Sequence, residues 1–217
     1  MNSDKMVRLL VDNKAIEVEE GTTLLQACLD NGIYIPNLCY VHGMEGRPAS
    51  CRMCFVEIEG TDKPVPSCTI KVTDRMVVKT DTAPVRRLQR MALQLLLSVH
   101  HVACKECPAN KRCELQRIAG FLKVGLKPKR LEQILKAPET DQVSPVLDFY
   151  PNRCVLCGRC IFVCGKTHKQ PFLTFAGRGL DTVISFYGAK DLPSLPCEKC
   201  LDCVDVCPVG AIVPRQT

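Results

Sequence analysis

Two short runs near the N-terminus alternate between apolar and polar positions. Residues 6–11 (MVRLLV) and 15–19 (AIEVE) place apolar side chains at roughly every second position. This period is typical of strands that bury one face. Asp12 and Asn13 lie between the two runs and suit a tight turn. The pattern therefore predicts a β-hairpin.

A short helix is predicted directly after this hairpin. Residues 22–31 (TTLLQACLDN) begin with Thr22, which can cap a helix, and Gly32 follows, which can end one. Cys28 lies four residues after Leu24, on the apolar face of this helix. We therefore expect Cys28 to be a buried core thiol.

A long loop and two further strands complete this region. The loop, residues 37–54, carries three cysteines. It is followed by the strand-like run 55–60 with a turn at Gly60, then by Cys68 and a second strand-like run at 76–80. Strand, strand, helix, loop, strand, strand is the element order of a β-grasp ferredoxin domain, and we expect that fold here.

The apolar residues take a helical period after Thr82. Thr82 can cap this helix, and Pro84 lies in the first turn, where a missing N–H does no harm. The helix leads to His100 and His101, and a basic segment at 121–140 is expected to be a linker. The stripe that we expect to be buried comprises Val85, Leu88, Met91, Leu95 and Val99.

The last third of the chain contains an internal repeat. CVLCGRCIFVC (154–164) and CEKCLDCVDVC (197–207) share the spacing C-x2-C-x2-C-x3-C. Between them, the strand-like runs 172–175 and 182–187 predict a second short hairpin. Two short segments of this kind, each with four cysteines, suggest a pseudo-twofold ferredoxin-like module.

The composition adds the chemistry, because 16 of the 217 residues are cysteine. Such a count indicates disulfides or metal ligands. Disulfides need an oxidising compartment, but the N-terminus lacks the apolar core and cleavage site of a secretory signal. No apolar run is long enough to span a membrane. We expect a reduced, cytoplasmic location in which thiols bind metals.

The net charge of +6 does not indicate a nucleic-acid partner. Lys and Arg are scattered, and no long basic tract occurs. The value also counts each cysteine as a neutral thiol, whereas a metal ligand is a thiolate. We expect no nucleic-acid partner.

The repeat has the cysteine spacing of bacterial ferredoxins, which bind two [4Fe–4S] clusters. The fourth cysteine of each run binds the other run's cluster. Zinc ribbons also use paired C-x2-C, but a third cysteine two residues later suits a cubane better. The expected ligand sets are Cys154, Cys157, Cys160 and Cys207 for one cluster, and Cys164, Cys197, Cys200 and Cys203 for the other.

A further set of four cysteines lies in the N-terminal region. The plant-type [2Fe–2S] spacing is C-x4-C-x2-C with a distant fourth cysteine. Here the first gap is longer and the last is shorter. Four thiols around a β-grasp loop still suit a [2Fe–2S] cluster, with zinc as the alternative. The expected ligands are Cys39, Cys51, Cys54 and Cys68.

The remaining metal-type motif, Cys104, Cys107 and Cys113, is one ligand short. The only other cysteine, Cys28, lies far back in the sequence on an apolar helix face. A ligand other than cysteine is therefore needed. The histidine pair at 100–101 is adjacent, and either histidine could supply it.

The run LLLSVHHVACKECPANKRCELQ resembles a known family of iron–sulfur subunits. H-x3-C-x2-C-x5-C followed by ELQ is similar to a one-His, three-Cys [4Fe–4S] site. That site occurs in the large iron–sulfur subunit of complex I, in [FeFe] hydrogenases and in the diaphorase part of NAD-reducing [NiFe] hydrogenases. SCRMCFVEIEG and PSCTIKVTDRMVVKT resemble the family's [2Fe–2S] segment. The resemblance covers nearly the whole chain and implies that His100, rather than His101, completes the site.

The expected fold class is α+β, in three regions. They are a β-grasp [2Fe–2S] domain at 1–80, a helical region with the His-ligated [4Fe–4S] cluster and linker at 81–140, and a 2[4Fe–4S] ferredoxin module at 141–217. The expected cofactors are therefore one [2Fe–2S] and three [4Fe–4S] clusters.

The resemblance implies an electron-transfer subunit with no catalytic site of its own. No G-x-G-x-x-G follows a strand, so no nicotinamide or flavin pocket is predicted. The chain ends ten residues after Cys207, whereas the relatives in complex I and the [FeFe] hydrogenases continue into long domains. This favours the short diaphorase subunit of an NAD(P)-linked [NiFe] hydrogenase. The implied partners are a flavoprotein subunit with FMN and NAD(P) and the hydrogenase small subunit.

Two alternatives stay open. The chain could belong to an NAD-dependent formate dehydrogenase or a complex I-like dehydrogenase. It could also be a zinc-binding interaction module without a redox role. Iron and zinc contents distinguish the second alternative from all the others.

Overall fold

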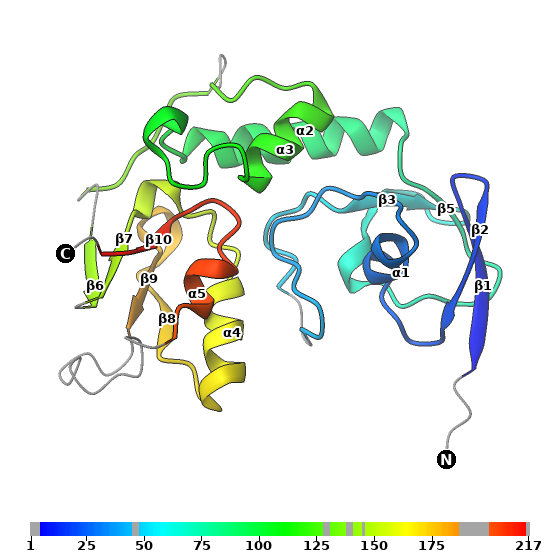
Figure 1. The fold of residues 1–217 in the computed structure, drawn as a ribbon. Helices are drawn as coiled ribbons and strands as arrows, with labels where there is room; N and C mark the ends of the chain where they lie inside the picture. Colours follow the sequence, from blue (N-terminus) through cyan, green and yellow to red (C-terminus); the bar gives the residue numbers. More distant parts are fainter. Residues whose placement is uncertain are drawn as a thin grey trace. The chain divides into compact units, whose positions relative to one another are not determined.

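The chain forms two compact units, Met1–Leu93 and Gln94–Thr217, in a computed structural model (Figure 1). No helix in the part of the chain that the structure describes is long and apolar enough to cross a membrane. The structure describes residues 5–44, 48–127, 131–137, 141–144, 146–186 and 200–215.

The first unit begins with the predicted hairpin. Strands β1 (Met6–Val11) and β2 (Lys14–Glu19) pair antiparallel. The turn between them has positive φ angles at Asp12 (48°) and Asn13 (69°). Asp and Asn tolerate this conformation better than most residues, and a two-residue turn of this type matches the twist of paired strands. The hairpin prediction is confirmed.

A five-stranded mixed sheet with the β-grasp arrangement forms this unit. The strand order is β2-β1-β5-β3-β4, and only β1 and β5 pair in parallel. Strands β3 (Phe55–Ile58) and β5 (Val77–Lys79) occupy their predicted positions. The sequence does not predict β4 (Val65–Pro66) or the 3-10 turn η1 (Ser67–Thr69). Elements of two or three residues are too short to show a period.

Helix α1 (Leu24–Asp30) starts slightly later than predicted. Its cap is Thr23, whose Oγ1 accepts a hydrogen bond from Gln26 N at 3.4 Å. The carbonyl of Thr22 instead accepts a hydrogen bond from Val72 N at 2.9 Å, which pairs Thr22 with another segment. The prediction of Thr22 as the cap was therefore wrong by one position.

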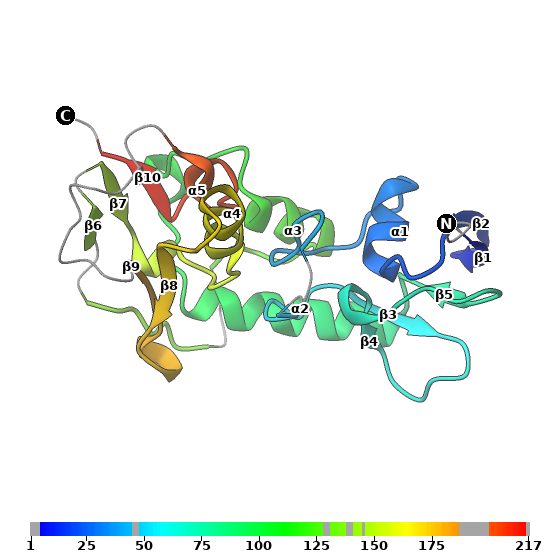
Figure 2. The ribbon, with the colours of Figure 1, turned by 90° about the horizontal axis from the view of Figure 1, so that it is seen from below.

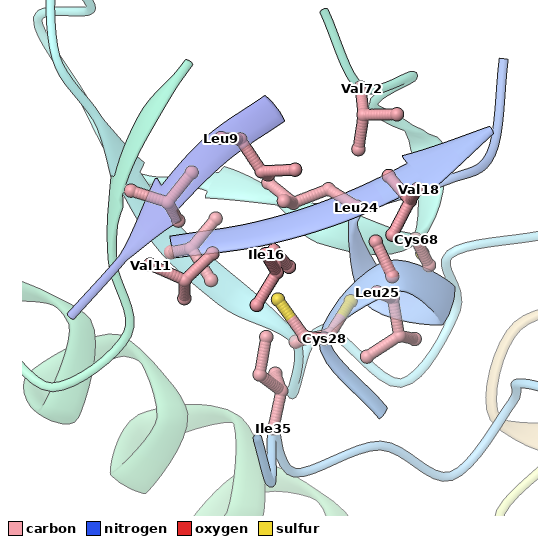
Figure 3. Packing of buried hydrophobic residues seen from close by; sticks show 14 of the residues in the cluster. Leu9, Val11, Ile16, Val18, Leu24, Leu25, Cys28, Ile35, Cys68 and Val72 are labelled. Carbon is pink, nitrogen blue, oxygen red and sulfur yellow. The ribbon is translucent and has the colours of Figure 1, made fainter. Parts of the chain in front are cut away.

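The apolar face of α1 and the sheet share one hydrophobic core (Figure 3). Alternate residues of β1, namely Val7, Leu9 and Val11, are buried in this core. Cys28 is fully buried in it, as predicted, and burial raises the pKa of its thiol to about 12. Cys28 is therefore a neutral core side chain at neutral pH.

Replacing Cys28 with alanine is expected to destabilise the first unit without removing a metal site. The small cavity costs roughly 1–2 kcal/mol of unfolding free energy, which lowers Tm by about 2–8 °C. Thermal unfolding followed by circular dichroism, with iron analysis of the same samples, checks both statements. Iron content should equal that of the wild type, and a loss of iron would instead identify Cys28 as a ligand.

Helix α2 (Ala83–Ser98) is capped as predicted, since Thr82 Oγ1 accepts a hydrogen bond from Val85 N at 3.3 Å. It buries a different face from the predicted one, because Met91 and Leu95 are 48% and 56% exposed. The fully buried side chains recur every four residues and are Val85, Gln89, Leu93 and Leu97. Gln89 obscured this stripe because it is polar; its Nε2 donates a hydrogen bond to the Phe55 carbonyl at 3.3 Å.

Two small sheets lie in the second unit (Figures 1 and 2). Strand β7 (Leu147–Phe149) lies between β10 (Ile212–Pro214) and β6 (Asp141–Ser144) and pairs antiparallel with both. Strands β8 (Leu173–Ala176) and β9 (Val183–Phe186) form an antiparallel hairpin. The hairpin predicted between the two cysteine runs is therefore confirmed.

Helices of the second unit carry or follow the cysteine motifs. Helix α4 (Arg159–His168) begins inside the first run and packs against α5 (Asp202–Asp205), which lies in the second run (Figure 2). Helix α3 (Glu114–Leu122), which the sequence did not predict, follows the three-cysteine segment. The division of the chain into three regions stays a prediction.

Candidate metal centres

Four buried thiols lie in the first unit. Cys39, Cys51 and Cys54 come from the long loop, Cys68 comes from η1, and none is more than 3% exposed. Cys39 Sγ and Cys51 Sγ are 3.5 Å apart. A side-chain hydrogen bond joins Cys54 to Cys68. Cys39 is also hydrogen-bonded to Cys68, so the four thiols form one connected group. Four adjoining thiols suit a [2Fe–2S] cluster, in which two protein ligands bind each iron.

The loop wraps these thiols mainly with its backbone. Ala49 and Arg52 have positive φ angles of 48° and 51°, which turn the chain on either side of Cys51. The backbone N of Leu38 donates a hydrogen bond to Cys51 Sγ at 3.4 Å. An N–H directed at sulfur stabilises a thiolate, and such bonds help to set cluster potentials.

Electrostatics keeps these four thiols from ionising together. Hydrogen bonds with the thiols of Cys51 and Cys68 lower the pKa of Cys39 to about 2. The hydrogen bond with Cys39, together with burial, raises the pKa of Cys51, and hydrogen bonds with neighbouring thiols raise that of Cys68. Four thiolates in this buried site therefore need cations to balance them.

One cavity of the second unit collects the one-His, three-Cys motif. Cys104 begins the 3-10 turn η2 (Cys104–Glu106), and Cys113 precedes α3 as its cap residue. The side chains of the motif that line the cavity are His100, Cys104, Cys107 and Cys113, with His101 beside them. The fold thus brings all four expected ligands of this site to one cavity.

The two histidines differ in burial. His100 is 9% exposed and its Nδ1 has no hydrogen-bond partner among the described residues, whereas His101 is exposed. Burial lowers the pKa of His100 to about 4, so its imidazole is neutral at neutral pH, the form that binds metals. A backbone hydrogen bond with Arg153 partly opposes this shift. A bond of this kind orients a histidine ligand.

A second cavity of this unit collects the first ferredoxin-type set. The thiols that line it are Cys154, Cys157, Cys160 and Cys207. The backbone N groups of Leu156 and Ala211 donate hydrogen bonds to Cys154 Sγ (3.4 Å) and Cys207 Sγ (3.2 Å). Burial raises the pKa of the Cys154 thiol to about 12. A protonated thiol is favoured here until a cation replaces the proton.

Three of the four thiols expected at the remaining site are described. Cys164 lies in α4, Cys203 lies in α5, and these helices pack together. Cys200 precedes α5 by two positions. The backbone N of Phe172 donates a hydrogen bond to Cys164 Sγ at 3.3 Å. The fourth expected ligand, Cys197, lies outside the described residues.

Within the described ranges, no three His, Cys, Asp or Glu side chains close around a single metal ion. A cluster distributes its ligands over several irons, so its thiols need not meet at one point. The N–H groups that face sulfurs include those of Leu38, Leu156, Phe172 and Ala211. Sequence reasoning missed them because every residue except proline carries this donor.

Three family models match successive parts of the chain. A 2Fe-2S iron–sulfur cluster binding domain matches residues 4–83. The iron–sulfur binding region of NADH-ubiquinone oxidoreductase G matches 89–126, and the ferredoxin-like domain of NADH-quinone oxidoreductase subunit 3 matches 144–213. These matches define an iron–sulfur protein with a [2Fe–2S] domain followed by [4Fe–4S]-binding regions.

Individual relatives extend this comparison over the whole chain. The NADP-reducing hydrogenase subunit HndD of Solidesulfovibrio fructosivorans is 34% identical over 97% of the chain, and the NADH-ubiquinone oxidoreductase 75 kDa subunit of Reclinomonas americana is 35% identical over 97%. The chain spans only 36% and 30% of the lengths of these two relatives. A chain of the NAD+-reducing [NiFe]-hydrogenase in its H2-reduced state has 27% identity and a TM-score of 0.83, with 97% of this chain and 88% of that chain covered.

The chain is an iron–sulfur protein related to subunits of NAD(P)-linked hydrogenases and complex I-type enzymes. This relationship supports an electron-transfer role. The predicted combination of a [2Fe–2S] domain with [4Fe–4S]-binding regions is confirmed. The ligand sets and the number of clusters stay predictions.

Proposed function

We propose that the chain holds one [2Fe–2S] and three [4Fe–4S] clusters. The residues fit these groups because each described set combines buried or half-buried thiols with backbone donors or a shared cavity. The proposed ligands are Cys39, Cys51, Cys54 and Cys68; His100, Cys104, Cys107 and Cys113; Cys154, Cys157, Cys160 and Cys207; and Cys164, Cys197, Cys200 and Cys203.

The proposed function is to relay electrons between a flavin- and NAD(P)-binding subunit and a [NiFe] hydrogenase module. The observation that carries it is the match to a chain of an NAD+-reducing hydrogenase over 97% of this chain and 88% of the other. When bound, the clusters supply one-electron redox chemistry. The protein's own contribution is to bury the ligands, direct N–H groups at sulfurs and exclude water.

Substrate chemistry belongs to the partners in this proposal. The expected partners are a subunit with FMN and NAD(P) and the hydrogenase small subunit, in a cytoplasmic assembly. The relatives also include a complex I-type subunit, so an equivalent place in a complex I-like dehydrogenase is the second candidate. An NAD-dependent formate dehydrogenase is a third candidate parent complex, because it would need the same electron relay between its substrate site and NAD. Purification of the native assembly and identification of its subunits distinguish these three parent complexes.

Iron analysis tests the cluster proposal directly. The anaerobically purified protein should be brown and contain about 14 iron atoms per chain, with a similar amount of acid-labile sulfide. Dithionite should produce paramagnetic signals of both cluster types, and chelation of the iron should abolish the colour. A colourless protein with about four zinc ions per chain would instead establish the binding-module alternative.

A further inference from the structure

Two short segments of the second unit lie side by side and end at the candidate sites. The first arm, residues 150–154, follows β7, and the second arm, residues 207–211, precedes β10. Strands β7 and β10 pair antiparallel (Figure 2). The pairing extends into the arms, since Tyr150 N donates a hydrogen bond to the Ala211 carbonyl at 2.8 Å. The two arms are therefore joined at their base.

The second arm touches the His100 site next to two of its expected ligands. Cys107 Sγ lies 3.8 Å from the Val209 carbonyl oxygen. The Pro208 carbonyl accepts a hydrogen bond from Glu114 N at 2.9 Å, directly after Cys113. This bond also satisfies a free N–H at the start of α3. The arm that supplies a thiol to one cavity thus positions ligands of the other.

The first arm makes the matching contacts on the histidine side. His101 N donates a hydrogen bond to the Asn152 carbonyl at 2.7 Å. A backbone hydrogen bond with Arg153 holds the His100 imidazole. Arg153 is followed directly by Cys154, which lines the other cavity. Each arm therefore contacts the His100 site and also carries a thiol of the Cys154–Cys207 site.

Val209 and Gly210 lie where the two sites meet. The Val209 side chain is buried and lines both cavities. Gly210 has a φ of +66°, and a Cβ there would lie 2.8 Å from Ala109 Cβ and 3.6 Å from Cys107 Sγ. A side chain at this position would therefore be strained and would displace either the arm or the segment that carries Cys107.

We propose that the two arms form a shared wall that fixes the two sites relative to each other, with Val209 and Gly210 as positioning residues. The proposal rests on the proposed function, because it requires clusters in both cavities. Ligand placement, hydrogen bonds to sulfur and solvent exposure tune a cluster's potential. Since the second arm carries Cys207 and also contacts Cys107 and the residue after Cys113, its displacement alters both clusters together.

The variant Gly210→Ala tests this wall. In the anaerobic full-length protein we expect wild-type iron content, but shifted electron paramagnetic resonance spectra and midpoint potentials for both clusters. Two further variants assign the signals to the clusters. Cys207→Ala should remove the signal of the Cys154–Cys207 site, and Cys113→Ala should remove that of the His100 site. Gly179→Ala is the matched control, because Gly179 also has a positive φ (+60°) but has nothing within 4 Å of an added Cβ. It should leave both signals unchanged.

A second variant covers the case in which Gly210→Ala loses iron. Val209→Ala removes part of the shared wall without requiring a new backbone conformation, and it should again shift both clusters. The proposal is overturned if either variant retains its iron but shifts only one cluster or neither. It is also overturned if Gly179→Ala shifts both clusters as much as Gly210→Ala does. A wild-type protein without iron overturns the proposed function itself, so its metal content is measured first.

Discussion

Replacing Cys207 with alanine is expected to remove one [4Fe–4S] cluster and lower the iron content from about 14 to about 10 atoms per chain. The reason is the cavity that Cys207 lines together with Cys154, Cys157 and Cys160. In sequence Cys207 belongs to the second run, but the fold places its thiol with the first three cysteines of the first run. Three remaining ligands leave one iron open to solvent, which makes the cluster labile.

In the proposed assignment, the fourth cysteine of each run binds the cluster of the other run, which we call crossed ligation. Double variants distinguish it from uncrossed ligation, in which the four cysteines of each run bind one cluster. Cys154→Ala combined with Cys207→Ala should lose no more iron than either variant alone, because both thiols serve one cluster. Cys154→Ala combined with Cys164→Ala should lose about eight iron atoms, because these thiols serve different clusters. Uncrossed ligation predicts the opposite result for each pair.

Iron and acid-labile sulfide are measured per chain on anaerobically purified protein. Cys28→Ala is the matched control, since it is the same substitution at a buried thiol that lies in the hydrophobic core. Its iron content should equal that of the wild type. If Cys207→Ala also keeps the full amount, Cys207 is not a ligand and the proposed set is wrong.

The elements that the sequence predicted correctly are those with a long local signal. β1 and β2 show a two-residue period over six residues each, with turn-forming residues between them. The hairpin of β8 and β9 was recognisable for the same reason. These features depend on neighbouring residues alone, so propensity and period suffice to find them.

The errors occurred where distant contacts decide the outcome. α2 buries Gln89 and exposes Met91, because the Phe55 carbonyl provides a partner for the amide. Thr23 caps α1 because Thr22 is already paired with Val72. Hydrophobicity cannot reveal a buried polar residue whose partner lies far along the chain.

The grouping of side chains in two of the cavities was within reach of the sequence, but the surroundings of the sulfurs were not. Cysteine spacing led to the three thiols and the histidine pair at 100–101, and the family resemblance selected His100, which shares the cavity of the three thiols. It contained no sign that Val209 would line two cavities, or that the Arg153 backbone would meet the imidazole. An aliphatic side chain and a backbone group have no distinctive pattern, and only the folded chain shows their place.

Replacing His100 with cysteine is expected to make its cluster harder to reduce, with a midpoint potential lower by on the order of 100 mV. A thiolate adds one negative charge where a neutral imidazole stood. His100 is 9% exposed, so water screens that charge poorly. Redox titration monitored by electron paramagnetic resonance measures the shift, and an iron content near the wild-type value shows that the cluster is retained.

His101→Ala is the matched control, because His101 lines the same cavity but its side chain is exposed. It should leave the potential unchanged. Pulsed electron paramagnetic resonance supplies a second readout, because it detects the hyperfine coupling of the cluster to a ligand nitrogen. This coupling should vanish in His100→Cys and persist in His101→Ala. Loss of that coupling in His101→Ala would identify His101 as the ligand. A potential in His100→Cys that is unchanged or higher would contradict the charge argument, because an added buried negative charge must oppose a further electron.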